Sequence, residues 1–334
     1  MELLNLFKNK KLSIDDIQFL NELLKTGMSL NDCLELLKNN KNIKIIESLQ
    51  VSLDKGQLIE NIITNYVSKE LDVFLSPLVK KVAFNKAVDL SLSFYLESKE
   101  NQKSILSSVA YPFILLFISM TALYIFDLYG LDSIFGLLTN FNTDISYYKV
   151  LRIVMRIVVF IFYFGLIFAS LLVVYFSNEK RIIIFYKWLA KYFPNSIYKS
   201  YCCEELVSFL LICQRMGYKT KDSLEYLKGI IKKPILSILA FNLDESLING
   251  LSLNEATETY WYDSLLTGYI KIASYTKDFE SILESYVRIS KDKIKRKIKN
   301  LASYIQTSIY LFIGLVLIFV YQILFMPMQA IGSF

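Results

Sequence analysis

Histidine is absent from the 334-residue chain, and cysteine occurs only four times. Without histidine, the chain lacks the commonest general base and the commonest metal ligand in proteins. The cysteines form no CxxC pair, and the adjacent Cys202 and Cys203 suit zinc poorly. We therefore expect reduced cytoplasmic thiols, no metal site and no cofactor.

Catalytic motifs are missing as well. The sequence contains no GxxxxGK[ST] phosphate loop, no GxSxG nucleophile elbow and no HExxH helix. A serine or cysteine nucleophile would need an unusual base in a chain without histidine. We therefore predict that the protein is not an enzyme and does not hydrolyse ATP itself.

Charged residues are missing from three long stretches. The run 300–334 contains none, and it exceeds the roughly 20 apolar residues that a helix needs to cross a bilayer. The runs 104–126 and 157–178 are also uncharged and long enough. Apolar residues make up 54% of the chain, which is too much for an ordinary soluble protein but too little for one made only of spans. The sequence thus predicts an integral membrane protein with soluble parts.

Lysine and arginine crowd together directly before the third run. The six cations are Lys291, Lys293, Lys295, Arg296, Lys297 and Lys299. Cytoplasmic flanks of membrane spans are rich in such residues, so we expect this stretch inside and the C-terminus outside. We also consider it a candidate contact for an acidic partner surface or for anionic lipid, although a topology signal with lipid contact is the simpler interpretation. Direct nucleic-acid binding is not expected, because the net charge of +6 is modest.

The soluble stretches have the apolar spacing of helices, and none alternates like a strand. The predicted fold class is an all-α membrane protein with two repeated cytoplasmic helical-bundle domains and three transmembrane helices, and the N-terminus is expected in the cytoplasm. We divide the chain into a helical domain (1–103), a first span (104–128), an extracytoplasmic loop (129–152), a second span (153–178), a basic aromatic segment (179–199), a second helical domain (200–299), a third span (300–328) and an extracytoplasmic tail (329–334).

Charges of both signs stand at the expected outer ends of the first two spans. Arg152 and Arg156 are one helical turn apart and share a face. They could pair with Asp127 or Asp132 at the end of the first span. The alternative is that both arginines extend to lipid headgroups.

Cations and aromatic residues are mixed in the segment 179–199. This composition predicts a helix that lies on the inner leaflet of the membrane. The alternative is a helix that is simply the buried beginning of the next domain.

The two soluble regions resemble each other in sequence. Phe19 precedes Gly27 by the same spacing as Phe209 precedes Gly217. Further matches follow at an offset that stays at roughly 190 residues, which argues for a duplication. Gly27 and Gly217 are expected to be structural, because a tight turn between two helices favours a residue with positive φ.

These features resemble the type II secretion F-domain family. The similarity rests on the pattern around Gly27, its second copy around Gly217, the Tyr-Pro pair at Pro112 in the first span and Pro327 near the end of the last span. The short N-terminal region is most similar to the Gram-positive competence branch, the ComGB type. The family's usual Gly-Glu-x-x-Gly-x-Leu segment is missing, so no metal ligands are carried over.

The resemblance implies an inner-membrane platform for a type IV pilus-like filament. Its implied partners are a cytoplasmic assembly ATPase, pilin or pseudopilin subunits, membrane lipids and further copies of itself. In a competence system the filament would serve DNA uptake. Two other functions remain open. A transporter permease subunit is disfavoured by the uncharged span centres, and a membrane-anchored signalling protein by the missing catalytic motif.

Overall fold

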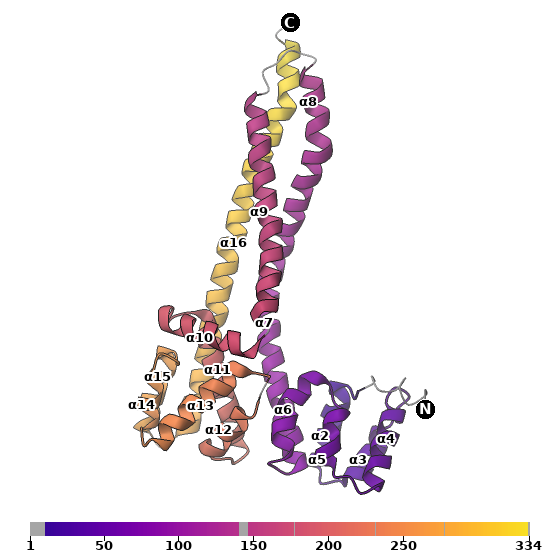
Figure 1. Cartoon of the computed structure of the whole chain (residues 1–334), viewed down its shortest axis with the longest axis vertical. Helices are drawn as coiled ribbons and strands as arrows, with labels where there is room; N and C mark the ends of the chain where they lie inside the picture. Colours follow the sequence, from indigo (N-terminus) through magenta and orange to yellow (C-terminus); the bar gives the residue numbers. More distant parts are fainter. Residues whose placement is uncertain (1–10, 140–145, 177, 231, 277, 333–334) are drawn as a thin grey trace. The chain divides into compact units, whose positions relative to one another are not determined.

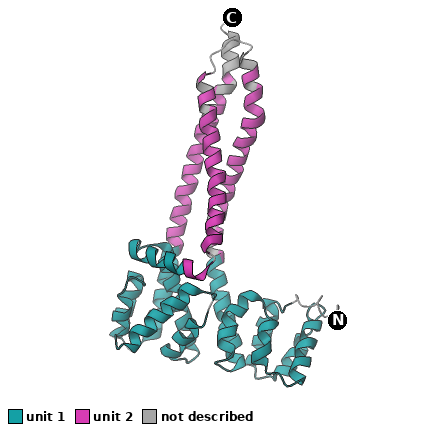
Figure 2. Ribbon diagram, viewed as in Figure 1, with its two compact units in different colours: residues 1–102, 182–294 teal, residues 103–181, 295–334 magenta. Residues whose placement is uncertain are grey.

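The computed structural model describes residues 11–139, 146–176, 178–230, 232–276 and 278–332, and within them every regular element is a helix (Figure 1). Three of these helices are long and apolar enough to cross a membrane. The predicted all-α membrane fold is therefore confirmed. The chain divides into two units (Figure 2): a globular unit, residues 1–102 and 182–294, and a span unit, residues 103–181 and 295–334.

Short helices form most of the first half of the globular unit. Ser13 begins the first of them with a capping box, in which its hydroxyl accepts from the Asp16 backbone N–H and the Asp16 carboxylate accepts from the Ser13 N–H. Gly27 follows that helix with φ of 84°. The elements are α2 (Ile14–Lys25), α3 (Leu30–Leu37), α4 (Ile43–Asp54), α5 (Ile59–Ile62), the 3₁₀ turn η1 (Ile63–Asn65), α6 (Lys69–Val79) and the start of α7 (Phe84–Ile125).

The second half of the globular unit is also a series of helices. The elements are α10 (Glu179–Tyr192), α11 (Ile197–Arg215), α12 (Thr220–Lys228), α13 (Pro234–Ile248), α14 (Leu253–Thr257), α15 (Ser264–Ser274) and the start of α16 (Phe279–Gly332). Gly217 has φ of 83° between α11 and α12, as Gly27 has between α2 and α3. Both glycines thus occupy the left-handed conformation that the sequence predicts for them.

One hydrophobic core runs through both halves of the globular unit. Phe94 of α7 stacks on Phe209 of α11, with ring centroids 3.6 Å apart, and both rings are almost fully buried. Most of the expected helical domains, 1–103 and 200–299, thus falls within a single unit, whereas residues 103 and 295–299 belong to the span unit. The first ten residues of the expected first domain lie outside the described part.

From α2 in the first half and from α11 in the second, the α-helices follow the same order. In each half this first helix, a positive-φ glycine and a second helix lead through three more α-helices into a long one, which is α7 in the first half and α16 in the second. Helix α10 and the 3₁₀ turn η1 have no counterpart among the described residues. An equivalent ion pair links the first helix to the long helix. Lys25 Nζ lies 2.9 Å from Asp89 Oδ1, and Arg215 Nη2 lies 2.8 Å from Glu284 Oε2.

The span unit contains the membrane candidates Ala110–Ser133 and Arg152–Phe176. The third candidate, the helix Phe279–Gln322, begins in the globular unit and enters the span unit at residue 295. Their bounds differ from the expected spans, and the expected loop 129–152 is largely helical. It contains α8 (Leu131–Thr139) and the start of α9 (Ser146–Phe176), whereas residues 140–145 lie outside the described part. The hydroxyls of Thr121 and Tyr163 lie 3.0 Å apart and join α7 to α9.

Both family-type prolines lie inside long helices. Pro112 is in the interior of α7 rather than at its beginning, so it removes one backbone hydrogen bond from this helix. The backbone of Pro327 belongs to α16, which continues to Gly332 into the expected tail 329–334, and the last two residues lie outside the described part.

Candidate functional site

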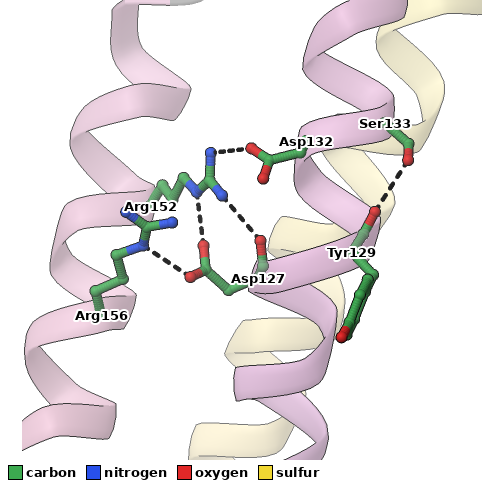
Figure 3. A network of polar contacts seen from close by, with 6 residues as sticks. All are labelled: Asp127, Tyr129, Asp132, Ser133, Arg152 and Arg156. Carbon is green, nitrogen blue, oxygen red and sulfur yellow. Dashed lines mark hydrogen bonds and ion pairs between the residues drawn. The ribbon is translucent and has the colours of Figure 1, made fainter.

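A short π-helical segment, η2 (Phe126–Gly130), separates α7 from α8 and presents Asp127. π-helical turns are rare, and they occur frequently at functional sites. Asp132 follows one turn later on α8, while Arg152 and Arg156 face them from α9 (Figure 3). The structure thus brings together all four residues that the sequence suggests for pairing between spans, and we call them the span-end cluster.

Arg152 is the centre of the span-end cluster (Figure 3). Its Nε donates to Asp127 Oδ1 at 2.6 Å, its Nη1 to Asp132 Oδ1 at 2.6 Å and its Nη2 to the Asp127 carbonyl oxygen at 2.9 Å. Arg156 Nε donates to the second carboxylate oxygen of Asp127 at 2.7 Å. Asp127 is therefore bound through three oxygen atoms by two arginines.

The cluster combines two acids with two bases, so it is neutral as a whole. The Asp127 side chain is 7% exposed and that of Arg152 is 15% exposed, whereas Arg156 and Asp132 are more than half exposed. A buried charge whose partner is removed destabilises a protein by about 3–5 kcal/mol. The central pair should consequently hold the ends of α7 and α9 together.

A groove of about 660 Å³ lies next to the cluster, between the end of α7 and α9. Its lining is mostly apolar and aromatic, with Asp127 and Arg156 as the charged members. The residues that line it are Leu123, Tyr124, Asp127, Leu128, Met155, Arg156, Val159, Phe160 and Tyr163. This shape and chemistry fit an apolar chain or helix that carries a polar group at one end.

A second polar cluster lies inside the globular unit, where α7, α11 and α16 meet. Lys291 of α16 pairs with Glu97 of α7, and its Nζ lies 3.8 Å from Glu204 Oε1 of α11. Nearby, Lys233 pairs with Glu205 and donates to Ser98 Oγ at 2.9 Å. We call these residues the junction cluster, because they link the long helices of the two halves.

Glu204 is the most deeply buried acid of the junction cluster, with 1% of the residue exposed. Its Oε1 accepts from Ser208 Oγ at 2.8 Å and its Oε2 from Asn101 Nδ2 at 3.2 Å. Burial raises the pKa of Glu204 to about 7, although the Ser208 hydrogen bond and the Lys291 charge favour the ionised form. This carboxyl therefore changes its protonation near neutral pH.

The comparison with known families concerns the second half of the chain. The sequence model of the family described as "Type II secretion system (T2SS), protein F" matches residues 206–327. Residues 206–327 form a T2SS protein F domain. This F domain begins in α11, includes α12–α15 and ends in α16. No curated protein sequence matches the chain.

For residues 206–327, the F-domain match confirms the resemblance that the sequence indicates. Members of the T2SS protein F family are membrane platform proteins of secretion and pilus systems rather than enzymes. Together with the three apolar helices, this indicates a multi-pass protein of the inner membrane. The likeness to the Gram-positive competence branch stays a prediction.

Within the F domain, the six basic residues differ in their surroundings. Lys291 contacts the acids of the junction cluster, as described above. Lys295 and Lys299 are exposed and Lys293 is half-buried, while Arg296 and Lys297 interact with other residues of the chain. Sequence reasoning missed the acidic partners of Lys291, because Glu97 lies 194 residues earlier in the chain.

Only one of the four cysteines, Cys213, lies in the F domain. All four cysteines are buried and free, and burial raises the pKa of the Cys213 thiol to about 12. These thiols are therefore unreactive at neutral pH. Among the described residues, no group of three or more histidine, cysteine, aspartate or glutamate side chains is arranged to hold a metal ion.

Proposed function

We propose that this chain is a non-enzymatic membrane platform that couples a cytoplasmic ATPase to the insertion of pilin subunits into a type IV pilus-like filament. The observation that carries the proposal is the F domain at residues 206–327, which leads directly into a candidate membrane span within the same helix, α16. We further propose that the filament serves DNA uptake in competence, and that several copies of the chain assemble together.

We also propose that residues 1–103 are a second, diverged F domain. The equal order of helices, the positive-φ glycines and the equivalent ion pairs of Lys25 and Arg215 support a duplication. In this proposal both halves of the globular unit lie in the cytoplasm, where they meet the ATPase. The C-terminus then lies on the extracytoplasmic side of the membrane.

The long helices α7 and α16 provide a route by which movement reaches the membrane. Each begins in the globular unit and continues without a break into a candidate span. The Lys291–Glu97 pair and the Phe94–Phe209 stack fix the first parts of these helices within one core. In this proposal, a displacement of the globular unit by the ATPase moves both spans together, and the spans contact the pilin helices.

The remaining cations of the basic stretch are the proposed electrostatic contact for the ATPase. Lys293, Lys295 and Lys299 are suited to this role, since Lys291 is occupied within the globular unit. A triple charge reversal, Lys293→Glu, Lys295→Glu and Lys299→Glu, should abolish co-purification of the ATPase with the full-length protein. Reversal of the exposed Lys219 and Lys221, at the beginning of α12, is the control. Unchanged ATPase binding with unchanged topology would assign the basic stretch to lipid contact instead.

Deletion of the gene in its host, with neighbouring genes intact, tests the function. Loss of both surface filaments and uptake of labelled DNA, each restored by the intact gene, is the expected result. Loss of filaments with normal DNA uptake would keep the platform function and assign it to another pilus or secretion system. Normal filaments and normal uptake would contradict the proposal and favour the permease alternative, which flux measurements in liposomes would then test.

A further inference from the structure

One face of α10 exposes large apolar side chains. Ile184, Trp188 and Tyr192 follow one another at helical spacing, and their exposed fractions are 67%, 50% and 62%. Phe193, directly after the helix, is 54% exposed. The Trp188 ring lies 6.0 Å from that of Tyr192 and 5.4 Å from that of Phe193, so these side chains form a continuous aromatic surface. Exposed apolar patches of this kind mark sites of interaction.

The opposite face of α10 fixes the direction in which this surface points. Tyr186 and Ala190 are buried in the core of the globular unit. The Tyr186 hydroxyl donates to the Trp261 carbonyl oxygen at 2.9 Å, and the Tyr186 and Trp261 rings stack at 6.1 Å. The exposure of Trp188 is therefore a consequence of the fold, since α10 cannot rotate without breaking these contacts.

Cations accompany the aromatic surface. Lys180, Arg181, Lys187 and Lys191 are all exposed, and Glu179 is the only acid of the helix. Tryptophan and tyrosine are enriched at membrane–water interfaces, where their rings lie at the level of the headgroups. Lysine and arginine on the same helix add attraction to anionic lipids.

Chain connectivity places α10 next to the end of a candidate span. Helix α9 ends at Phe176 and α10 begins at Glu179, three residues later. Three residues of chain reach about 10 Å at most, so the end of α9 and the beginning of α10 lie within this distance of each other. The Arg181 guanidinium carbon also lies 4.2 Å from the centre of the Tyr175 ring in the last turn of α9. If α9 crosses the bilayer, the first turn of α10 must therefore lie at its surface.

We propose that the exposed face of α10 binds anionic phospholipid. Trp188, Tyr192 and Phe193 enter the headgroup region, and Lys187 and Lys191 contact the lipid phosphates. The surface would fix the distance between the globular unit and the membrane. This inference is independent of the platform function, because it rests only on α10 and on the adjoining span.

Tryptophan fluorescence tests the proposal, since the chain contains only two tryptophans. The variant Trp261→Phe leaves Trp188 as the reporter, and the matched variant Trp188→Phe leaves Trp261, which packs on the buried side of α10. Both full-length proteins are reconstituted into vesicles that contain brominated phosphatidylglycerol or brominated phosphatidylcholine. We expect blue-shifted Trp188 emission with strong loss of fluorescence in brominated lipid, and much weaker loss for Trp261.

Charge variants identify the lipid class. In the Trp261→Phe protein, the additional substitutions Lys187→Gln and Lys191→Gln should lower the preference for the anionic over the zwitterionic brominated lipid by roughly thirtyfold. Lys219→Gln with Lys221→Gln, two exposed lysines at the beginning of α12, should leave the preference unchanged. Trp188 that is quenched by aqueous acrylamide but not by brominated lipid would overturn the proposal. Protection of Trp188 from both quenchers would also overturn it, because a protein partner or a second copy would then cover this face.

Discussion

Replacing Glu204 by glutamine is expected to stabilise the globular unit at pH 8 and to leave its stability unchanged at pH 4.5. Glutamine has nearly the same shape, and it retains groups that can hydrogen-bond to Ser208 and Asn101. The change removes only the buried negative charge. Lys291 keeps a partner in the variant, because it remains paired with Glu97.

The magnitude follows from the pKa of Glu204, which burial raises from its ordinary value of 4.5 to about 7. Below pH 4.5 the carboxyl is protonated in both the folded and the unfolded protein, so it contributes no pH dependence. Between pH 4.5 and about pH 7 the folded protein binds more protons than the unfolded one, so the stability of the folded protein falls as the pH rises. Above pH 7 the full loss is about 3 kcal/mol, since each pKa unit corresponds to about 1.4 kcal/mol.

Thermal unfolding in detergent across this pH range is the assay. For a unit of this size, about 3 kcal/mol corresponds to a Tm increase of roughly 6–12 °C for the variant at pH 8. Glu245→Gln removes an exposed acid of α13 and should leave the Tm unchanged. A lower Tm for Glu204→Gln at pH 8 would refute the reasoning, because it would show that attraction to Lys291 outweighs the cost of burying the charge.

Three further predictions concern other parts of the structure, and each compares two variants. Asp127→Asn should destabilise the span unit by about 3 kcal/mol, because it removes the buried negative charge and leaves the cluster with an excess positive charge. Asp127→Leu combined with Arg152→Leu should cost much less, because it removes both buried charges and keeps the cluster neutral. Protease resistance in membranes measures both, and an equal loss in the two proteins would contradict a paired cluster. Gly217→Ala should lower the free energy of unfolding by about 1–2 kcal/mol, because Gly217 has a positive φ that alanine adopts poorly. The control is Gly268→Ala in helix α15, where an added Cβ meets open space, and it should raise the free energy of unfolding by about 0.5–1 kcal/mol. Equal effects of the two substitutions in thermal unfolding would argue against strain at Gly217. Phe94→Ala should lower the free energy of unfolding by about 3–5 kcal/mol, because it removes the buried stack with Phe209. The control Phe19→Ala, at a half-exposed position, should cost under about 1 kcal/mol. A small loss of stability for Phe94→Ala would show that the two halves share no core.

Local chemistry allowed much of this architecture to be predicted from the sequence. Uncharged runs are sufficient to locate helices that can cross a membrane, because a bilayer excludes charge and requires a minimum length. The turns at Gly27 and Gly217 were equally predictable, since few other residues adopt positive φ. The bounds of a span are harder to predict. Asp127 and Asp132 indicate that the first span ends near residue 128, whereas the apolar helical stretch extends to Ser133, and both aspartates pair there with Arg152.

Contacts between distant parts of the chain were not predictable. Phe94 and Phe209 gave no sign of their stacking, because apolar residues at helical spacing reveal only that a face is buried and not what covers it. Lys291 was grouped with its five basic neighbours because a run of cations indicates exposure. Its pairing with Glu97 depends on the packing of α7 against α11 and α16, which no local pattern specifies. The π-helical segment at Asp127 likewise has no recognisable sequence signal.

Site-specific photocrosslinking in native membranes tests the central claim most directly. A photoreactive amino acid in place of Phe164, which is 59% exposed on the candidate span of α9, would report what contacts this span while the filament system is expressed. The platform function predicts a crosslink to a pilin-like subunit that disappears when the pilin gene is deleted. Crosslinks to lipid alone, with filaments still assembling normally, would contradict a contact between this span and the pilin.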